Sequence, residues 1–147
     1  MGRGMVRNLA AAGHEVRLYA RTPARAEGLP AAVAASVAEA VDGAELGCSC
    51  VTDSDDVRQV IEAALGAPAP PPVWVELSTI APAVARELAD RCAERGVAYL
   101  DCPVSGGPPG AEAGTLAIMC GGDAGALVAA APALDAMGDP AKRVHCG

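Results

Sequence analysis

MGRGMVRNLAAAGHEVRLYART, residues 1–22, predicts a helix, a turn at Gly13 and His14, and a short apolar strand over residues 15–20. This order is typical of the second half of a strand–turn–helix–strand unit that binds dinucleotides. The glycine-rich turn of such a unit, G-x-G-x-x-G, would begin before Met1, which puts Gly2 in the place of its third glycine. We therefore expect Met1 and Gly2 to face a cofactor pyrophosphate, and a preceding strand to be absent from the chain.

Short apolar strands alternate with helical patterns along the rest of the chain. The expected strands cover residues 15–20, 46–52, 73–78, 97–103, 116–122 and 143–146. Strands that alternate with helices form a parallel sheet that is covered on both faces. The sequence therefore predicts one α/β domain over residues 1–147, with a doubly wound, Rossmann-like parallel sheet that lacks its first strand and no C-terminal helical domain.

Three helix starts carry recognisable capping signals. Ser36 is followed three residues later by Glu39, which makes a capping box. Asp53 or Ser54 can cap the next helix, whose apolar residues recur at helical spacing behind it. Thr79 is the expected cap of the helix after that one, with a proline tolerated in its first turn.

Composition and charge argue against several classes of partner. The 147 residues carry a net charge of −7 at pH 7, which repels nucleic acid, and contain no Phe for stacking on bases. No apolar run of residues is long enough to span a membrane. The six cysteines show neither C-x-x-C spacing nor a grouping with histidine, so we expect no metal site, and reduced thiols in the cytoplasm.

The first 25 residues are basic, although the whole chain is acidic. Five arginines lie there against a single carboxylate at Glu15. The segment suits a small anionic ligand, or is simply a solvated basic face. After the early strand of a dinucleotide site a carboxylate binds the ribose hydroxyls of NAD, whereas an arginine suits the 2′-phosphate of NADP. Arg21 and Thr22 occupy that position, and they favour NADP with NAD as the alternative.

Small polar residues and glycines recur directly after the expected strands, where ligands bind in doubly wound sheets. Val51 and Thr52 follow one strand, Thr79 follows the next, and VSGG at residues 104–107 follows another. Successive backbone N–H groups in such a glycine-rich turn can converge on a carboxylate. Helix caps and an ordinary turn would produce part of the same pattern without any ligand.

Three motifs resemble the cofactor-binding domain of the β-hydroxyacid dehydrogenases, the family of 3-hydroxyisobutyrate dehydrogenase. Met1, Gly2, Met5, Asn8 and Leu9 match the later part of the family's opening, G-x-G-x-M-G-x-x-M-x-x-N-L. ELSTIAP, residues 76–82, matches its S-T-x-x-P motif. LDCPVSGGPPGAEAGTLAIMCGGD, residues 100–123, matches its substrate-binding signature, with cysteine in place of the usual alanine.

This resemblance implies the NADP-binding domain of an oxidoreductase that interconverts a short 3-hydroxy acid and its semialdehyde by hydride transfer. Thr79 would lie beside the nicotinamide, and Val51 and Thr52 would line the cofactor where the family has Leu-Pro. Ser105, Gly106 and Gly107 would hold the carboxylate of the small substrate.

The family's proton-transfer lysine belongs to a helical domain that would follow residue 147. The only lysine here is Lys142, which we interpret as a surface residue. We therefore expect a domain truncated at both ends, with no catalytic residue and negligible activity alone. Met1 would then be internal to a longer reading frame, or the chain a shortened copy. Homo-oligomers would form through the helical domain.

Two other interpretations stay open. The chain could be a non-catalytic module for cofactor binding or assembly. It could also be a fragment of a relative of 6-phosphogluconate dehydrogenase or imine reductase, because the absent helical domain is where those enzymes would differ.

Overall fold

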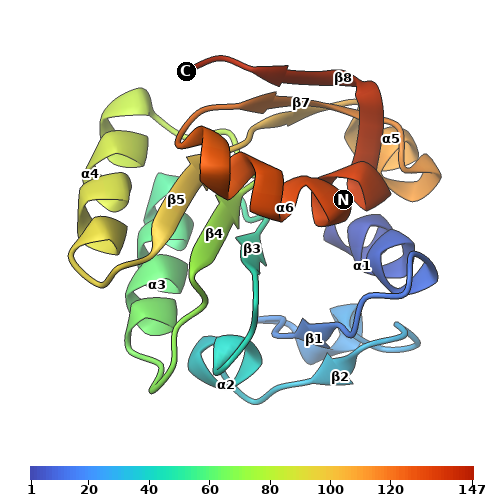
Figure 1. Ribbon diagram of the computed structural model, residues 1–147. Coiled ribbons are helices and arrows are strands. Elements are labelled where there is room, and N and C mark those ends of the chain that lie inside the picture. The colour runs from blue at the N-terminus through green and yellow to red at the C-terminus, as the bar shows by residue number, and fades with distance from the viewer.

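A computed structural model describes all residues from 1 to 147, and it alternates strands with helices (Figure 1). The first half contains α1 (Gly2–Ala11), β1 (Arg17–Leu18), the 3₁₀ helix η1 (Pro23–Arg25), β2 (Ala32–Val33), α2 (Val37–Val41), β3 (Gly47–Ser49) and α3 (Ser54–Leu65). The second half contains β4 (Val73–Glu76), α4 (Pro82–Ala93), β5 (Ala98–Asp101), β6 (Val104–Ser105), α5 (Gly107–Ala113), β7 (Leu116–Cys120), α6 (Ala124–Met137) and β8 (Gly138–His145).

The strands form three sheets. β1 pairs with β2, and β3, β4 and β5 form a second sheet; all of these pairs are parallel. In the third sheet β7 runs parallel to β8 and antiparallel to β6. No strand pairs with the remaining edge of β1 or of β3, and the first strand of a doubly wound sheet would lie between those edges. The expected Rossmann-like fold without its first strand is confirmed.

Helices cover both faces of the β3–β4–β5 sheet, because β4 directs apolar side chains to each of the two faces. Val75 faces a core cluster that includes residues of α1 and α6. Trp74 faces a second cluster that includes residues of α3 and α4. In Figure 1, α3 and α4 lie together on one side of β4 and β5, while α6 crosses the other side. This arrangement leaves the strand ends as the accessible part of the sheet.

Two of the expected caps are confirmed. The Ser36 hydroxyl accepts a hydrogen bond from the Glu39 N–H at 3.1 Å. The Asp53 carboxylate accepts hydrogen bonds from the N–H groups of Asp55 and Asp56 at the start of α3. Each cap joins residues two or three positions apart, so that neighbouring sequence is enough to specify it.

The expected cap at Thr79 is wrong. α4 begins at Pro82, with Ala81 at the capping position and no side-chain hydrogen bond there. Proline is favoured in the first turn because it needs no N–H acceptor and its φ already suits a helix. Thr79 is instead an exposed residue between β4 and α4, and its hydroxyl is not used to start the helix.

Candidate functional site

Two contacts connect the segment after β1 to helices: one to the start of α3 and one to the start of α1. Arg21, after β1, pairs with Asp56 in the first turn of α3, with 2.7 Å between Nη1 and Oδ1. Arg3, in the first turn of α1, donates to the carbonyl oxygens of Arg25 and Glu27 at 2.6 and 3.2 Å. Arg21 therefore lies beside the start of α3, and the start of α1 contacts the segment that follows Thr22.

Met1 and Gly2 lie close to the end of β3. Burial raises the pKa of the Cys50 thiol after β3, and the positive charge of the nearby amino terminus opposes part of that rise. No side chain caps α1, and its first turn contains no acidic residue. A Cβ placed on Gly2 would meet no atom within 4 Å. An uncapped ten-residue helix with open space at its first glycine has the donors that a pyrophosphate needs.

The loops after β3 and β4 are joined by a hydrogen bond. The Val51 N–H donates to the Ser78 hydroxyl at 2.8 Å. Val51 is half-buried, whereas Thr52 and Thr79 are exposed. The structure therefore brings together two of the predicted site segments, each with an exposed threonine.

A buried carboxylate lies beneath these two loops. Glu76, the last residue of β4, is fully buried. One of its oxygens accepts a hydrogen bond from the Ser49 hydroxyl and the other from the Ser78 N–H, the latter at 2.9 Å. Burial raises the pKa of Glu76, while the hydrogen bonds from Ser49 and Ser78 oppose that rise.

The motifs of the sequence do not single out Glu76. The available signal was an acidic residue inside VWVELS, residues 73–78, a strand expected to be buried. Buried carboxylates are rare unless hydrogen bonds satisfy them. An acid at that position therefore indicates donors on a neighbouring strand, although the sequence does not say which ones.

The predicted substrate segment lies between β6 and α5. Gly106 and Gly107 have φ values of 134° and 60°, which favour glycine over other residues. A Cβ on Gly106 would also lie 3.1 Å from Leu116 Cδ2. Ser105 is exposed at the end of β6. The backbone of this turn therefore has a conformation that glycine adopts more readily than any other residue.

Packing between α1 and α5 connects the substrate segment to the cofactor segment. A Cβ on Gly4 would lie 2.7 Å from the backbone of Ala111, so that the two helices touch at that glycine. The Asn8 side chain donates to the Ala111 carbonyl at 2.8 Å. Ser105 itself forms no hydrogen bond with Arg21, Val51 or Thr79, and the connection is made through α1.

Other candidate groups lie apart from these loops. Lys142 pairs with Asp139 at 3.2 Å and is exposed, and the His145 ring lies 2.9 Å from the Gly122 carbonyl oxygen. No three His, Cys, Asp or Glu side chains are grouped so that they could hold a metal ion. None of the helices has both the length and the apolar character needed to cross a membrane.

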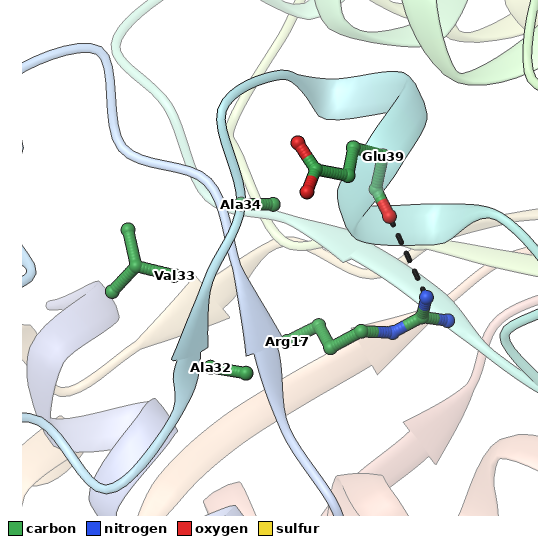
Figure 2. Close-up of a pocket in the computed structure, with 5 residues that line it drawn as sticks. All are labelled: Arg17, Ala32, Val33, Ala34 and Glu39. Carbon is green, nitrogen blue, oxygen red and sulfur yellow. Dashed lines mark hydrogen bonds between the residues drawn. The ribbon is translucent and has the colours of Figure 1, made fainter.

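Two surface hollows contain none of the predicted site residues. One has a volume of about 130 Å³ and is lined by Arg17, residues 32–34 and Glu39; Figure 2 shows Arg17 pointing to the Glu39 backbone carbonyl. The other, of about 240 Å³, lies between α4 and the end of β5. Neither of these hollows is therefore part of the predicted site.

Comparison with known proteins identifies the class of this domain. The model of the NAD-binding domain of 6-phosphogluconate dehydrogenase matches residues 1–147. An NAD-dependent L-serine dehydrogenase of Pseudomonas aeruginosa is 42% identical over 144 residues, which cover 94% of this chain and 48% of the relative. A probable 3-hydroxyisobutyrate dehydrogenase of Mycobacterium tuberculosis is 39% identical, covering 100% of this chain and 50% of the relative.

Solved structures agree with the sequence relatives. The 3-hydroxyisobutyrate dehydrogenase of M. tuberculosis, solved with L-serine, has a TM-score of 0.94 and 39% identity over 100% of this chain and 51% of that one. An imine reductase of Streptomyces aurantiacus has a TM-score of 0.85 and 32% identity, over 97% and 50%.

The fold and the matches define an NAD(P)-binding oxidoreductase domain. The chain belongs to the 6-phosphogluconate dehydrogenase/3-hydroxyisobutyrate dehydrogenase family. It spans about half the length of the curated relatives that it matches.

Proposed function

We propose that this chain is the NADP(H)-binding domain of an enzyme that interconverts a short 3-hydroxy acid and its semialdehyde. The names of its relatives support this substrate class, because 3-hydroxyisobutyrate and L-serine are both carboxylic acids with a hydroxyl on the third carbon. Six free cysteines in this chain are consistent with a reducing compartment such as the cytoplasm.

The observation that supports NADP most directly is the position of Arg21. It lies after β1 and pairs with the first turn of α3, and the ribose end of a dinucleotide binds after the early strand in this fold class. The side chain of Arg21 is 74% exposed. The neighbouring Thr22 makes no capping hydrogen bond to η1, so its hydroxyl is free to assist a 2′-phosphate.

Each remaining segment has one part in this proposal. Met1 and Gly2 present the start of α1 to the pyrophosphate, and Val51 and Thr52 line the cofactor. Thr79 lies beside the nicotinamide, whose role when bound is to accept or donate the hydride. A further segment, Ser105–Gly107, holds the substrate carboxylate with a hydroxyl and backbone N–H groups.

The chain contains one lysine, Lys142, as a candidate for moving the substrate proton. Lys142 is engaged by Asp139 on the exposed β8 strand. We therefore propose that the chain binds cofactor without turnover on its own. A purely cofactor-binding or assembly role would look the same in this respect, so the two differ only in whether the 3-hydroxy acid binds as well.

Titration calorimetry of the purified chain tests the proposal. We expect NADPH to bind, and Arg21→Ala to weaken NADPH about tenfold while changing NADH less than about twofold, because one charge-assisted contact to phosphate is lost. The matched control is Arg95→Ala, which removes an exposed arginine remote from β1. Failure of the chain to bind either cofactor would refute the proposal, and turnover of 3-hydroxyisobutyrate or L-serine would refute the absence of catalysis.

Imine reduction is a second candidate, supported by the 32% identity to the S. aurantiacus enzyme over 97% of this chain. An imine substrate needs no carboxylate site. If Ser105→Ala weakens binding of 3-hydroxyisobutyrate to the NADP-loaded chain, the hydroxy-acid function is favoured. If the chain binds no carboxylate at all, the hydroxy-acid function is disfavoured, and turnover of an imine would then separate imine reduction from a purely cofactor-binding role.

A further inference from the structure

NADP binding is proposed to depend on Arg21, and the guanidinium of Arg21 already forms an ion pair with Asp56. Nη1 and Oδ1 lie 2.7 Å apart, and the Asp56 side chain is only 16% exposed. Thirty-five residues separate the two side chains in sequence. The pair therefore comes from the way the end of β1 faces the first turn of α3.

Asp56 is the acid of this turn that faces Arg21. The Asp53 carboxylate accepts the N–H groups of Asp55 and Asp56 as the cap of α3. The Asp55 carboxylate pairs with Arg58 on the same helix at 3.0 Å and is 85% exposed. Among these three neighbouring acids, Asp56 is the one whose carboxylate contacts Arg21.

Two forms of the cofactor experience this carboxylate differently. A 2′-phosphate carries a charge of about −1.5 to −2 near neutral pH, so it must compete with Asp56 for Arg21 and is repelled by it. A 2′-hydroxyl is neutral and meets no such repulsion. The same carboxylate therefore weakens the binding of one cofactor while leaving that of the other nearly unchanged.

We propose that Asp56 is a specificity-determining residue, which lowers the preference for NADPH over NADH by holding the Arg21 guanidinium. This inference rests on the proposed function. It refines the simple rule that an arginine after the early strand selects NADP, because here that arginine already has a partner.

Calorimetric titration of NADPH and NADH into the 147-residue chain and its variants tests the role of Asp56. We expect Asp56→Asn to raise the ratio of NADPH to NADH affinity about fivefold, because the variant loses the ion pair that competes with the 2′-phosphate for Arg21 and an ion pair at the surface is worth about that much. Asp56→Glu, which keeps the carboxylate, should stay close to the parent ratio. Asp55→Asn is the matched control, because it removes an equal charge from the same helix turn without touching Arg21, and its ratio should not change.

Circular dichroism will show whether each variant folds, and Asp56→Ser, with a residue tolerated at helix starts, replaces Asp56→Asn if that variant does not. An unchanged ratio in folded Asp56→Asn, or an equal rise in Asp55→Asn, would overturn the inference while leaving cofactor binding intact. If the parent chain binds neither cofactor, the proposed function itself fails and the inference falls with it.

Discussion

The hydroxyl of Ser78 accepts a hydrogen bond from the backbone N–H of Val51 at 2.8 Å. The N–H of Ser78 in turn donates to the buried carboxylate of Glu76, which also accepts from Ser49. Two loops at the strand ends, one containing Thr52 and the other Thr79, are thus joined through a polar network within the core. A substitution at Glu76 should therefore disturb the hydrogen bonds that connect both loops.

Glu76→Gln tests the cost of this buried charge. The raised pKa of Glu76, due mainly to burial, means that the folded state binds the proton more tightly than the unfolded state. The stabilisation from this group is full below about pH 4.5, the ordinary value, and is lost as the pH rises through the raised pKa. Glutamine does not ionise, so the unfolding free energy of Glu76→Gln relative to the parent should rise as the pH increases through the raised pKa of Glu76.

Urea denaturation at several pH values measures that difference. The exposed Glu45→Gln, which removes a surface carboxylate, serves as the control. A Glu76→Gln difference that is constant or shrinks with rising pH would contradict the interpretation of Glu76 as a costly buried carboxylate.

Gly4→Ala should weaken the contact between α1 and α5. The added Cβ would lie 2.7 Å from the backbone of Ala111 and 2.8 Å from the Glu112 nitrogen, and backbone cannot move aside as a flexible side chain can. We expect a loss of about 1–3 kcal/mol in unfolding free energy, together with weaker NADPH binding because α1 carries Gly2. Gly2→Ala provides the comparison: it meets no neighbour, so it should unfold like the parent chain, and equal losses in both variants would contradict the prediction.

Gly47→Ala should destabilise the fold at β3. Its Cβ would fall 2.5 Å from the Trp74 ring, a distance that real contacts do not show, and 2.9 Å from Pro71. Because Trp74 is buried against α3 and α4, we expect a cost of about 1–3 kcal/mol by thermal or urea unfolding. Gly66→Ala is the control, since Gly66 has an ordinary helical φ of −79° and its nearest neighbour lies at 3.4 Å. It should change stability by less than about 1 kcal/mol.

Cys92 should resist alkylation in the folded chain. It is fully buried on α4, and burial, with a smaller contribution from Glu62, raises the pKa of its thiol to about 11. The thiolate needed for reaction is therefore scarce at pH 8. Mass spectrometry after iodoacetamide treatment should find the exposed Cys146 modified first, and Cys92 modified only as urea unfolds the protein. Labelling of Cys92 as fast as Cys146 would show that α4 is not packed as described.

Strand positions followed from the sequence better than strand lengths did. The expected strand over residues 15–20 became Arg17–Leu18, because β1 pairs only with the two residues Ala32 and Val33 of β2. Apolar character predicts that a segment enters the sheet, whereas the partner decides how many residues form the ladder. β2 itself was not expected, since two residues are too few to show a pattern.

The amino-acid sequence by itself determined the alternation of strands and helices, the caps at Ser36 and Asp53, and the glycine-rich turn at residues 105–107. Each depends on residues a few positions apart, and local hydrogen bonding and periodicity act over that range. Only the tertiary structure decided that Arg21 pairs with Asp56, that Ser49 and Ser78 satisfy Glu76, and that Gly4 touches Ala111. Those contacts join side chains that come together only after strands and helices have been ordered in space, so no short stretch of sequence contains both partners.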